Sequence, residues 1–222
     1  MTGQQFWGYI HILLLVFWLG GDIGVFINAR IAKTTLYSVE ARAALLKTGG
    51  ITDLFPRYCF ALIFPSGLTL VDAMGLYAPP LWALLGAWAI GAVWVWAIWT
   101  AHATPNWKGL KTYIKVQFWG EAVIGVLLLA AALTSFATGS PVAEKWLAAK
   151  ILLLGALCFV AMTLEVVSRP FGVAFTEIKT QGSTPERETR ANAAMNRTLG
   201  VVLVIYAILL AVALIGRVKP FG

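Results

Sequence analysis

Apolar residues run in six long stretches along this chain, each bounded by polar or turn-forming residues. A helix needs about 20 predominantly apolar residues to cross the hydrocarbon core of a bilayer. Each stretch comes close to that length or reaches it, so the pattern predicts an all-α bundle of about six transmembrane helices. The predicted spans are Phe6–Asn28, Tyr58–Leu76, Leu81–Ala101, Val116–Phe136, Glu144–Val167 and Leu199–Ile215.

The composition supports a membrane protein without a separate soluble domain. Hydrophobic residues make up 59% of the 222 positions and charged residues 12%, whereas soluble domains are about 25% charged. Residues 1–222 are therefore predicted to form one integral-membrane domain. The first apolar stretch lacks a preceding basic segment and contains His11 and Asp22, so we expect it to stay in the bundle and not to be a cleaved signal peptide.

Basic residues gather in alternate connections between the predicted spans. The basic connections carry Arg30, Lys33, Arg42, Lys47, Arg57, then Lys108, Lys111, Lys115, then Arg169, Lys179, Arg187, Arg190 and Arg197. The positive-inside rule places these three connections in the cytoplasm and both termini outward, as expected for a multi-pass protein of a bacterial inner membrane. The net charge of +7 is then explained by contact with anionic lipid, and no nucleic-acid partner is expected.

The sequence predicts local structure for two of the connections between spans. Within Ile31–Arg57 the pattern predicts a short amphipathic helix in the membrane interface, followed by Gly49–Gly50. The hydrophilic segment Thr180–Arg190 predicts a mobile cytoplasmic loop.

His11 and Lys150 are the least expected residues, because each lies inside an apolar stretch. Ionisable side chains in a membrane span are costly and indicate function. Depth along the predicted spans puts both residues in an outer layer with Asp72. Asp22, Glu121 and Glu165 fall in an inner layer.

His11, Trp18 and Asp22 are spaced seven and four residues apart, which places them on nearly the same helix face. We expect that face to point into the bundle. The deeper tryptophans (Trp18, Trp88, Trp94, Trp96 and Trp99) are candidates for lining a flat ligand such as a porphyrin, although packing against lipid or neighbouring helices is the favoured interpretation.

Several chemistries would use these residues. A neutral imidazole can bind haem iron or copper, and a lysine can pair with a porphyrin propionate. Carboxylates at stepped depths can relay protons. The structural alternative is that Asp22 and Glu121 or Glu165 form ion pairs with Arg57 or Arg169 near the interface.

Two observations limit the metal chemistry. The second histidine, His102, falls at the opposite end of its span, about 20–30 Å from His11, so the two histidines of one chain cannot bind the same haem iron. A site in which His11 is completed by Lys150, a methionine or a second protomer stays open. Soft copper sites use cysteine and methionine clusters, and the four methionines are scattered along the chain.

Four segments resemble the HemJ-type protoporphyrinogen oxidases and the related copper-resistance D membrane proteins. IHILLLVFWLGG (10–21) is similar to the family's histidine-containing first helix, and WLAAKILLLGALCF (146–159) to its lysine-containing helix. GITDLFPRYCFALIFPSGLTL (50–70) and the ending VVLVIYAILLAVALIGRVKPFG (201–222) are similar to its second and last helices. The family resembles four-span proteins, whereas this chain adds Leu81–Ala101 and Val116–Phe136, and Asp22 and Glu121 have no counterpart.

The resemblance implies a membrane oxidoreductase that binds haem b. It implies His11 as the axial iron ligand, Lys150 as a second essential residue, and oxidation of protoporphyrinogen with electrons passed to the respiratory chain. On this hypothesis Lys150, Asp22 and Glu121 are catalytic, and His11, Lys150 and Trp18 bind the cofactor.

Partners and alternatives follow from the same residues. The expected partners are the lipid bilayer, a tetrapyrrole or quinone-linked substrate, and a second copy or a membrane-complex subunit. The alternative functions are a transporter of copper or another small solute, and a non-catalytic subunit of a larger membrane complex.

Overall fold

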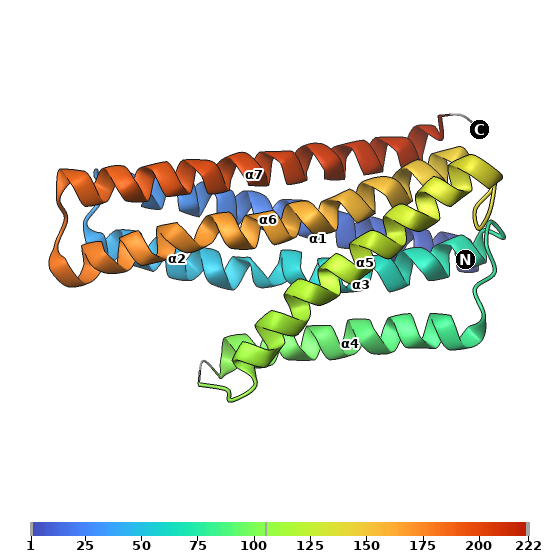
Figure 1. Cartoon of the computed structure of the whole chain (residues 1–222), viewed down its shortest axis with the longest axis horizontal. Helices are drawn as coiled ribbons and strands as arrows, with labels where there is room; N and C mark the ends of the chain where they lie inside the picture. Colours follow the sequence, from blue (N-terminus) through green and yellow to red (C-terminus); the bar gives the residue numbers. More distant parts are fainter. Residues whose placement is uncertain (1, 105, 221–222) are drawn as a thin grey trace.

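Seven helices make up the computed structural model, which describes residues 2–104 and 106–220 (Figure 1). They are α1 (Gly3–Ala32), α2 (Val39–Thr52), α3 (Leu54–Ala73), α4 (Leu81–Ala103), α5 (Leu110–Thr138), α6 (Lys145–Gln181) and α7 (Pro185–Val218). No β-strand occurs among those residues, and the predicted all-α class is confirmed.

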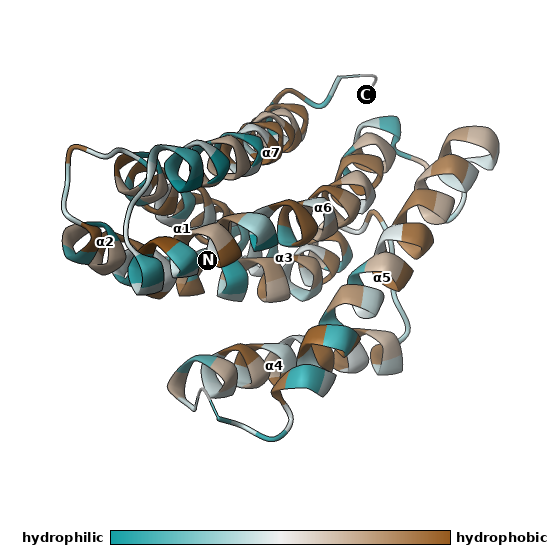
Figure 2. Ribbon diagram, turned by 60° about the vertical axis from the view of Figure 1, so that its left-hand side comes forward, coloured by the Kyte–Doolittle hydropathy of each residue, from teal (hydrophilic) through white to brown (hydrophobic). Residues whose placement is uncertain are grey.

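Six segments are long and apolar enough to cross a membrane, as predicted. The helices α2 and α3 run end to end and count as one such segment, Val39–Ala73, and the other five helices supply one each. Large apolar side chains such as Trp82, Leu85 and Val93 are mostly exposed, which suits helix faces that contact lipid. Apolar residues cover the middle of the helices, and hydrophilic ones gather near the connecting turns (Figure 2). The chain is therefore a multi-pass membrane protein.

The helices form two packed groups with α4 at the side. α1 lies against α3, and α6 lies against both α7 and α5. α4 packs on α3, while α5 crosses the bundle diagonally away from α4 (Figure 1). Both chain termini lie at one end of the bundle, here called the terminal end, and the α6–α7 turn lies at the other, here called the basic end (Figure 1). Which end faces outward stays a prediction from the charge pattern.

Three apolar clusters divide the bundle along its length. The terminal cluster contains Val142, Trp146 and Leu147. The central cluster contains Trp18, Cys59, Ile63, Leu157, Ile205 and Leu209. The basic-end cluster contains Phe171, Ala174, Phe175, Ile178, Ala191, Ala194, Met195 and Leu199. The chain order of these residues leaves two intervals for polar side chains, one on each side of the central cluster.

At the basic end, α6 and α7 continue far beyond the predicted spans. α6 ends at Gln181 and α7 begins at Pro185, whereas the predicted boundaries were Val167 and Leu199. Each helix thus gains 14 residues (181 − 167 and 199 − 185), or about 21 Å at 1.5 Å per residue. The predicted loop Thr180–Arg190 is wrong, because only three residues separate the two helices.

The helix predicted within Ile31–Arg57 exists as α2, but Gly49–Gly50 lie inside it and not after it. α2 continues into α3 along the bundle (Figure 1). Its residues Val39, Ala43 and Leu46 are partly buried and pack against the basic-end cluster. The position of α2 in the membrane interface stays a prediction.

Two glycines allow α5 and α6 to approach closely. A Cβ added to Gly155 would lie 3.1 Å from the carbonyl oxygen of Gly125, and one added to Gly125 would lie 2.8 Å from Phe159 Cε2. Small residues at helix contacts have this effect in membrane bundles. The contact matters because α5 and α6 carry Glu121 and Lys150.

We expect Gly125→Ala to lower the free energy of unfolding by about 1–2 kcal/mol relative to Gly120→Ala, because the new methyl overpacks the contact. Gly120 is the matched control, since it lies on the same helix with open space at its Cβ position and gains the same helix propensity. Unfolding of both variants in detergent measures the difference. Equal stabilities would contradict the close contact.

Candidate functional site

His11 is held on α1 by a hydrogen bond to α3. Its Nδ1 lies 3.0 Å from Ser66 Oγ, and the Ser66 hydroxyl donates its own proton to the carbonyl oxygen of Ile63 at 3.0 Å. A hydroxyl has one proton to donate, so when that proton goes to Ile63 the Ser66 oxygen can accept the Nδ1 proton of a neutral imidazole. The lone pair of that ring is then on Nε2, which is the form in which a histidine binds a metal.

The backbone of α3 also fits the imidazole. A Cβ on Gly67 would lie 3.1 Å from His11 Cε1, so the ring rests where a larger residue would collide with it. Ser66 is completely buried. The position of the His11 ring is therefore set by two consecutive residues of α3, Ser66 and Gly67.

Lys150 of α6 lies in the same layer. Its Nζ lies 2.7 Å from the position that a Cβ on Gly216 would occupy, so the lysine extends over α7. Lys150 lies between Leu147 of the terminal cluster and Leu154, which packs on the central cluster, and Ser66, the partner of His11, lies between Val71 and Ile63 of the same two regions. His11, Ser66 and Lys150 form what we call the histidine layer, between the terminal and central clusters, and the predicted shared depth of His11 and Lys150 holds.

Asp72 lies on α3 between Val71 and Met74, which pack against the terminal cluster. Its side chain is exposed, and among the described residues it makes no side-chain hydrogen bond or ion pair. Equal depth was the basis for grouping it with His11. Depth does not fix the direction in which a side chain points around the helix, and the structure does not bring Asp72 into contact with His11 or Lys150.

A cavity of about 490 Å³ with charged residues in its lining, here called the carboxylate chamber, lies on the other side of the central cluster. Residues from α1, α2, α3, α5, α6 and α7 line it. Its charged residues are Asp22, Asp53, Arg57, Glu121 and Glu165, and its aromatic residues are Trp18, Phe26, Phe60 and Tyr113. The predicted inner layer of Asp22, Glu121 and Glu165 is thus brought together around one space.

Two of the four carboxylates in the chamber have a cationic partner. Arg57 pairs with Asp53, and Arg169 pairs with Glu165 at 2.8 Å. The structural alternative drawn from the sequence therefore holds for Glu165. It does not hold for Asp22 or Glu121, because neither forms an ion pair among the described residues.

Glu121 is the most deeply buried of these carboxylates, at 3% exposed. Gln117 donates a hydrogen bond of 3.1 Å to its Oε1, and no other side-chain bond to Glu121 occurs among residues 2–104 and 106–220. A buried charge without a cation is costly. The carboxyl group of Glu121 is thus either protonated or, when charged, without a cationic partner among the described residues.

A second cavity of about 240 Å³ adjoins the chamber and is lined mainly by apolar residues of α3, α4, α5 and α6. Glu121 and Phe60 line both cavities. Glu121 therefore borders both cavities. The lining of the chamber has other charged residues, whereas the rest of the second cavity is mainly apolar.

Trp18 and Asp22 share the interior face of α1 with His11, as their spacing predicted. Trp18 is buried in the central cluster, with its ring 5.3 Å from that of Phe60, while Asp22 lines the chamber. Trp96 and Trp99 are more than half exposed, which fits packing toward lipid and not a ligand site.

Ser66 and Gln117 were missed by sequence reasoning. A single serine inside a predicted apolar span carries no distinct signal. Gln117 lies four residues before Glu121, which is one helical turn and therefore a detectable pairing.

The segment that resembles the last helix of the HemJ-type oxidases includes Phe221, which lies outside the described residues.

Comparisons with protein-family models, with curated proteins and with solved structures find no match for this chain. No three His, Cys, Asp or Glu side chains of residues 2–104 and 106–220 come together as a metal-binding group. The site is thus defined by its own geometry: a histidine layer and a carboxylate chamber, separated by the central cluster of a six-span bundle.

Proposed function

We propose that this chain is a membrane oxidoreductase that binds haem b through His11 Nε2. The observation that supports it is the hydrogen bond from His11 Nδ1 to Ser66, whose own proton goes to Ile63. A histidine that binds a metal through one ring nitrogen donates a hydrogen bond from the N–H of the other nitrogen to an oriented acceptor. The resemblance to HemJ-type oxidases gives the same residue as the iron ligand.

The donors in the histidine layer fit a haem. His11 offers an unprotonated nitrogen, and Lys150 offers a cation for a propionate or for the carboxylates of a tetrapyrrole substrate. His11 lines neither of the two cavities, so a porphyrin bound at its Nε2 would have to displace side chains around the histidine layer. When bound, haem supplies one-electron transfer. Asp22 and Glu121 would hold protons at the chamber, and electrons would pass to a quinone-linked acceptor of the respiratory chain.

The absorption spectrum of the purified protein, oxidised and reduced, tests this proposal. We expect a reduced b-type α-band that His11→Ala abolishes, because the iron loses its protein ligand. His102→Ala is the matched control, since His102 is exposed at the end of α4 and should leave the band unchanged. A folded wild-type protein without haem, purified from haem-supplemented cells, would overturn the proposal.

A small-solute transporter is the second candidate, and one observation favours it. Two polar regions, the histidine layer and the carboxylate chamber, lie on opposite sides of an apolar barrier that contains Trp18 and Leu157. Alternating access requires such a barrier between two polar regions. Solute uptake into liposomes that is lost in His11→Ala, together with a colourless protein, would support transport over redox chemistry.

A further inference from the structure

We propose that the carboxylate chamber and the adjoining apolar cavity together bind an amphiphilic organic cation, with its charged group at Glu121 and Asp22 and its apolar body between α3, α4 and α5. This site is separate from the histidine layer, and the proposal does not depend on haem binding.

Charge is the first argument. Four carboxylates and one arginine line the chamber, and Asp22 and Glu121 have no cationic partner among the described residues. Glu121 is almost fully buried and receives one hydrogen bond, from Gln117. Charged carboxylates in such surroundings are stabilised by a cation close by, and no side chain of the described residues forms an ion pair with Asp22 or Glu121.

The size and spread of the site select an organic cation over a metal ion. The carboxylates of the chamber are distributed around a volume of about 490 Å³, and among the described residues they do not converge as a metal-binding group. Metal ions need several oxygen ligands at about 2.0–2.6 Å. Volumes of about 300–1,000 Å³ are typical of sites for small organic molecules.

Aromatic side chains point to the same chemistry. Trp18, Phe60 and Tyr113 line the chamber together with the carboxylates. The faces of aromatic rings attract cations, and quaternary ammonium groups are recognised in this way. An alkylated or protonated amine would satisfy rings and carboxylates at once.

The apolar cavity explains why the ligand should be amphiphilic. Its surface is formed by side chains such as Ile63, Ile90 and Leu127, and it meets the chamber at Glu121 and Phe60. Burial of an apolar body there is favourable by the hydrophobic effect. Its lining includes residues of α4 and α5, two helices that diverge toward the terminal end (Figure 1), so a ligand dissolved in the bilayer would enter from the side.

Equilibrium binding of radiolabelled tetraphenylphosphonium to the detergent-purified full chain tests the proposal. We expect saturable binding that Glu121→Gln weakens at least about 10-fold, because the variant keeps the shape and removes the charge. Asp22→Asn should weaken it in the same direction and serves if Glu121→Gln fails to fold. Glu177→Gln is the control, since Glu177 pairs with Arg190 away from the chamber and should bind like the wild type.

Two competitors and one variant complete the test. Tetraphenylborate, an anion of the same shape, should not displace the probe, and tetraethylammonium, which lacks a large apolar body, should displace it only weakly. His11→Ala should bind the probe normally, so that failure of the haem proposal and failure of this one are distinguishable. The proposal is overturned by absence of saturable binding, by equal competition from tetraphenylborate, or by binding that neither Asp22→Asn nor Glu121→Gln changes.

Discussion

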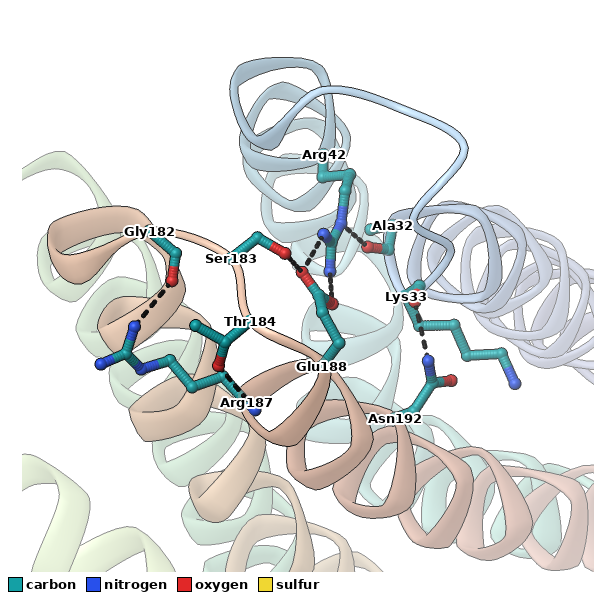
Figure 3. A network of polar contacts seen from close by, with 9 residues as sticks. All are labelled: Ala32, Lys33, Arg42, Gly182, Ser183, Thr184, Arg187, Glu188 and Asn192. Carbon is teal, nitrogen blue, oxygen red and sulfur yellow. Dashed lines mark hydrogen bonds and ion pairs between the residues drawn. The ribbon is translucent and has the colours of Figure 1, made fainter.

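Replacing Arg42 with methionine is expected to lower the free energy of unfolding by about 3–5 kcal/mol, because it leaves the carboxylate of Glu188 buried without its cation. Arg42 donates from both terminal nitrogens to Glu188, at 2.8 and 2.9 Å, and from Nε to the carbonyl oxygen of Ala32 at 2.7 Å (Figure 3). The two side chains are 2% and 9% exposed. The pair joins α2 and the end of α1 to the beginning of α7.

The surroundings of this pair add to the cost of breaking it. Ser183 donates a hydrogen bond of 2.7 Å to Glu188 (Figure 3), which cannot neutralise the charge by itself. The guanidinium also lies 5.2 Å from the centre of the Phe175 ring, so Arg42 contributes cation–π attraction to the basic-end cluster. The methionine would retain part of the packing and none of the charge.

A double-mutant cycle in detergent measures the effect. Arg42→Met with Glu188→Leu should recover most of the lost stability, because a buried pair can be exchanged for apolar residues at little cost. Arg190→Met is the matched control: Arg190 pairs with Glu177 but is half exposed, and surface pairs contribute about 0–1 kcal/mol. If Arg42→Met were no more destabilising than Arg190→Met, the pair would not be a structural link.

The transmembrane architecture was predicted from the sequence, whereas the helical extension at the basic end was missed. Apolar residues in the spans are nearly continuous, and such stretches allow one structure in a bilayer. In the extension, Phe171, Phe175 and Ile178 lie among polar residues, and the hydrophilic turn dominated the pattern. The local signal was nevertheless present, because Thr184 caps α7 and Pro185 occupies its first turn, a combination typical of a helix start.

The depth of the site residues along the bundle could be predicted from the sequence. The direction in which each side chain points around its helix could not. The rise of a helix assigns depth, and His11 and Lys150 do lie in one layer. The direction of a side chain around its helix depends on which neighbours the helix meets, and this separated Asp72 from the others. The carboxylate chamber depends on how α5 crosses α6 and on the gap between non-neighbouring helices, neither of which the spacing of Asp22 or Glu121 reveals.

The role of Ser66 gives the sharpest test of how α3 prepares His11. If His11 binds haem, Ser66→Ala removes the acceptor of the Nδ1 proton and lets the imidazole change tautomer and turn. Loss of such an outer partner weakens metal binding by about 10–100-fold, so we expect the variant to lose haem at concentrations at which the wild type retains it. Haem titration followed by the Soret band measures this difference.

Thr69→Val is the matched control for Ser66→Ala, because it removes a hydroxyl from the same helix one turn further on. The Thr69 hydroxyl accepts a hydrogen bond from Trp88 and donates to Pro65, and neither contact involves His11. The control should therefore bind haem like the wild type while losing its link to α4. If Ser66→Ala bound haem as tightly as the control, the bond to Ser66 would not orient the ligand, and His11 would owe its position to Gly67 and the packing of α1 alone.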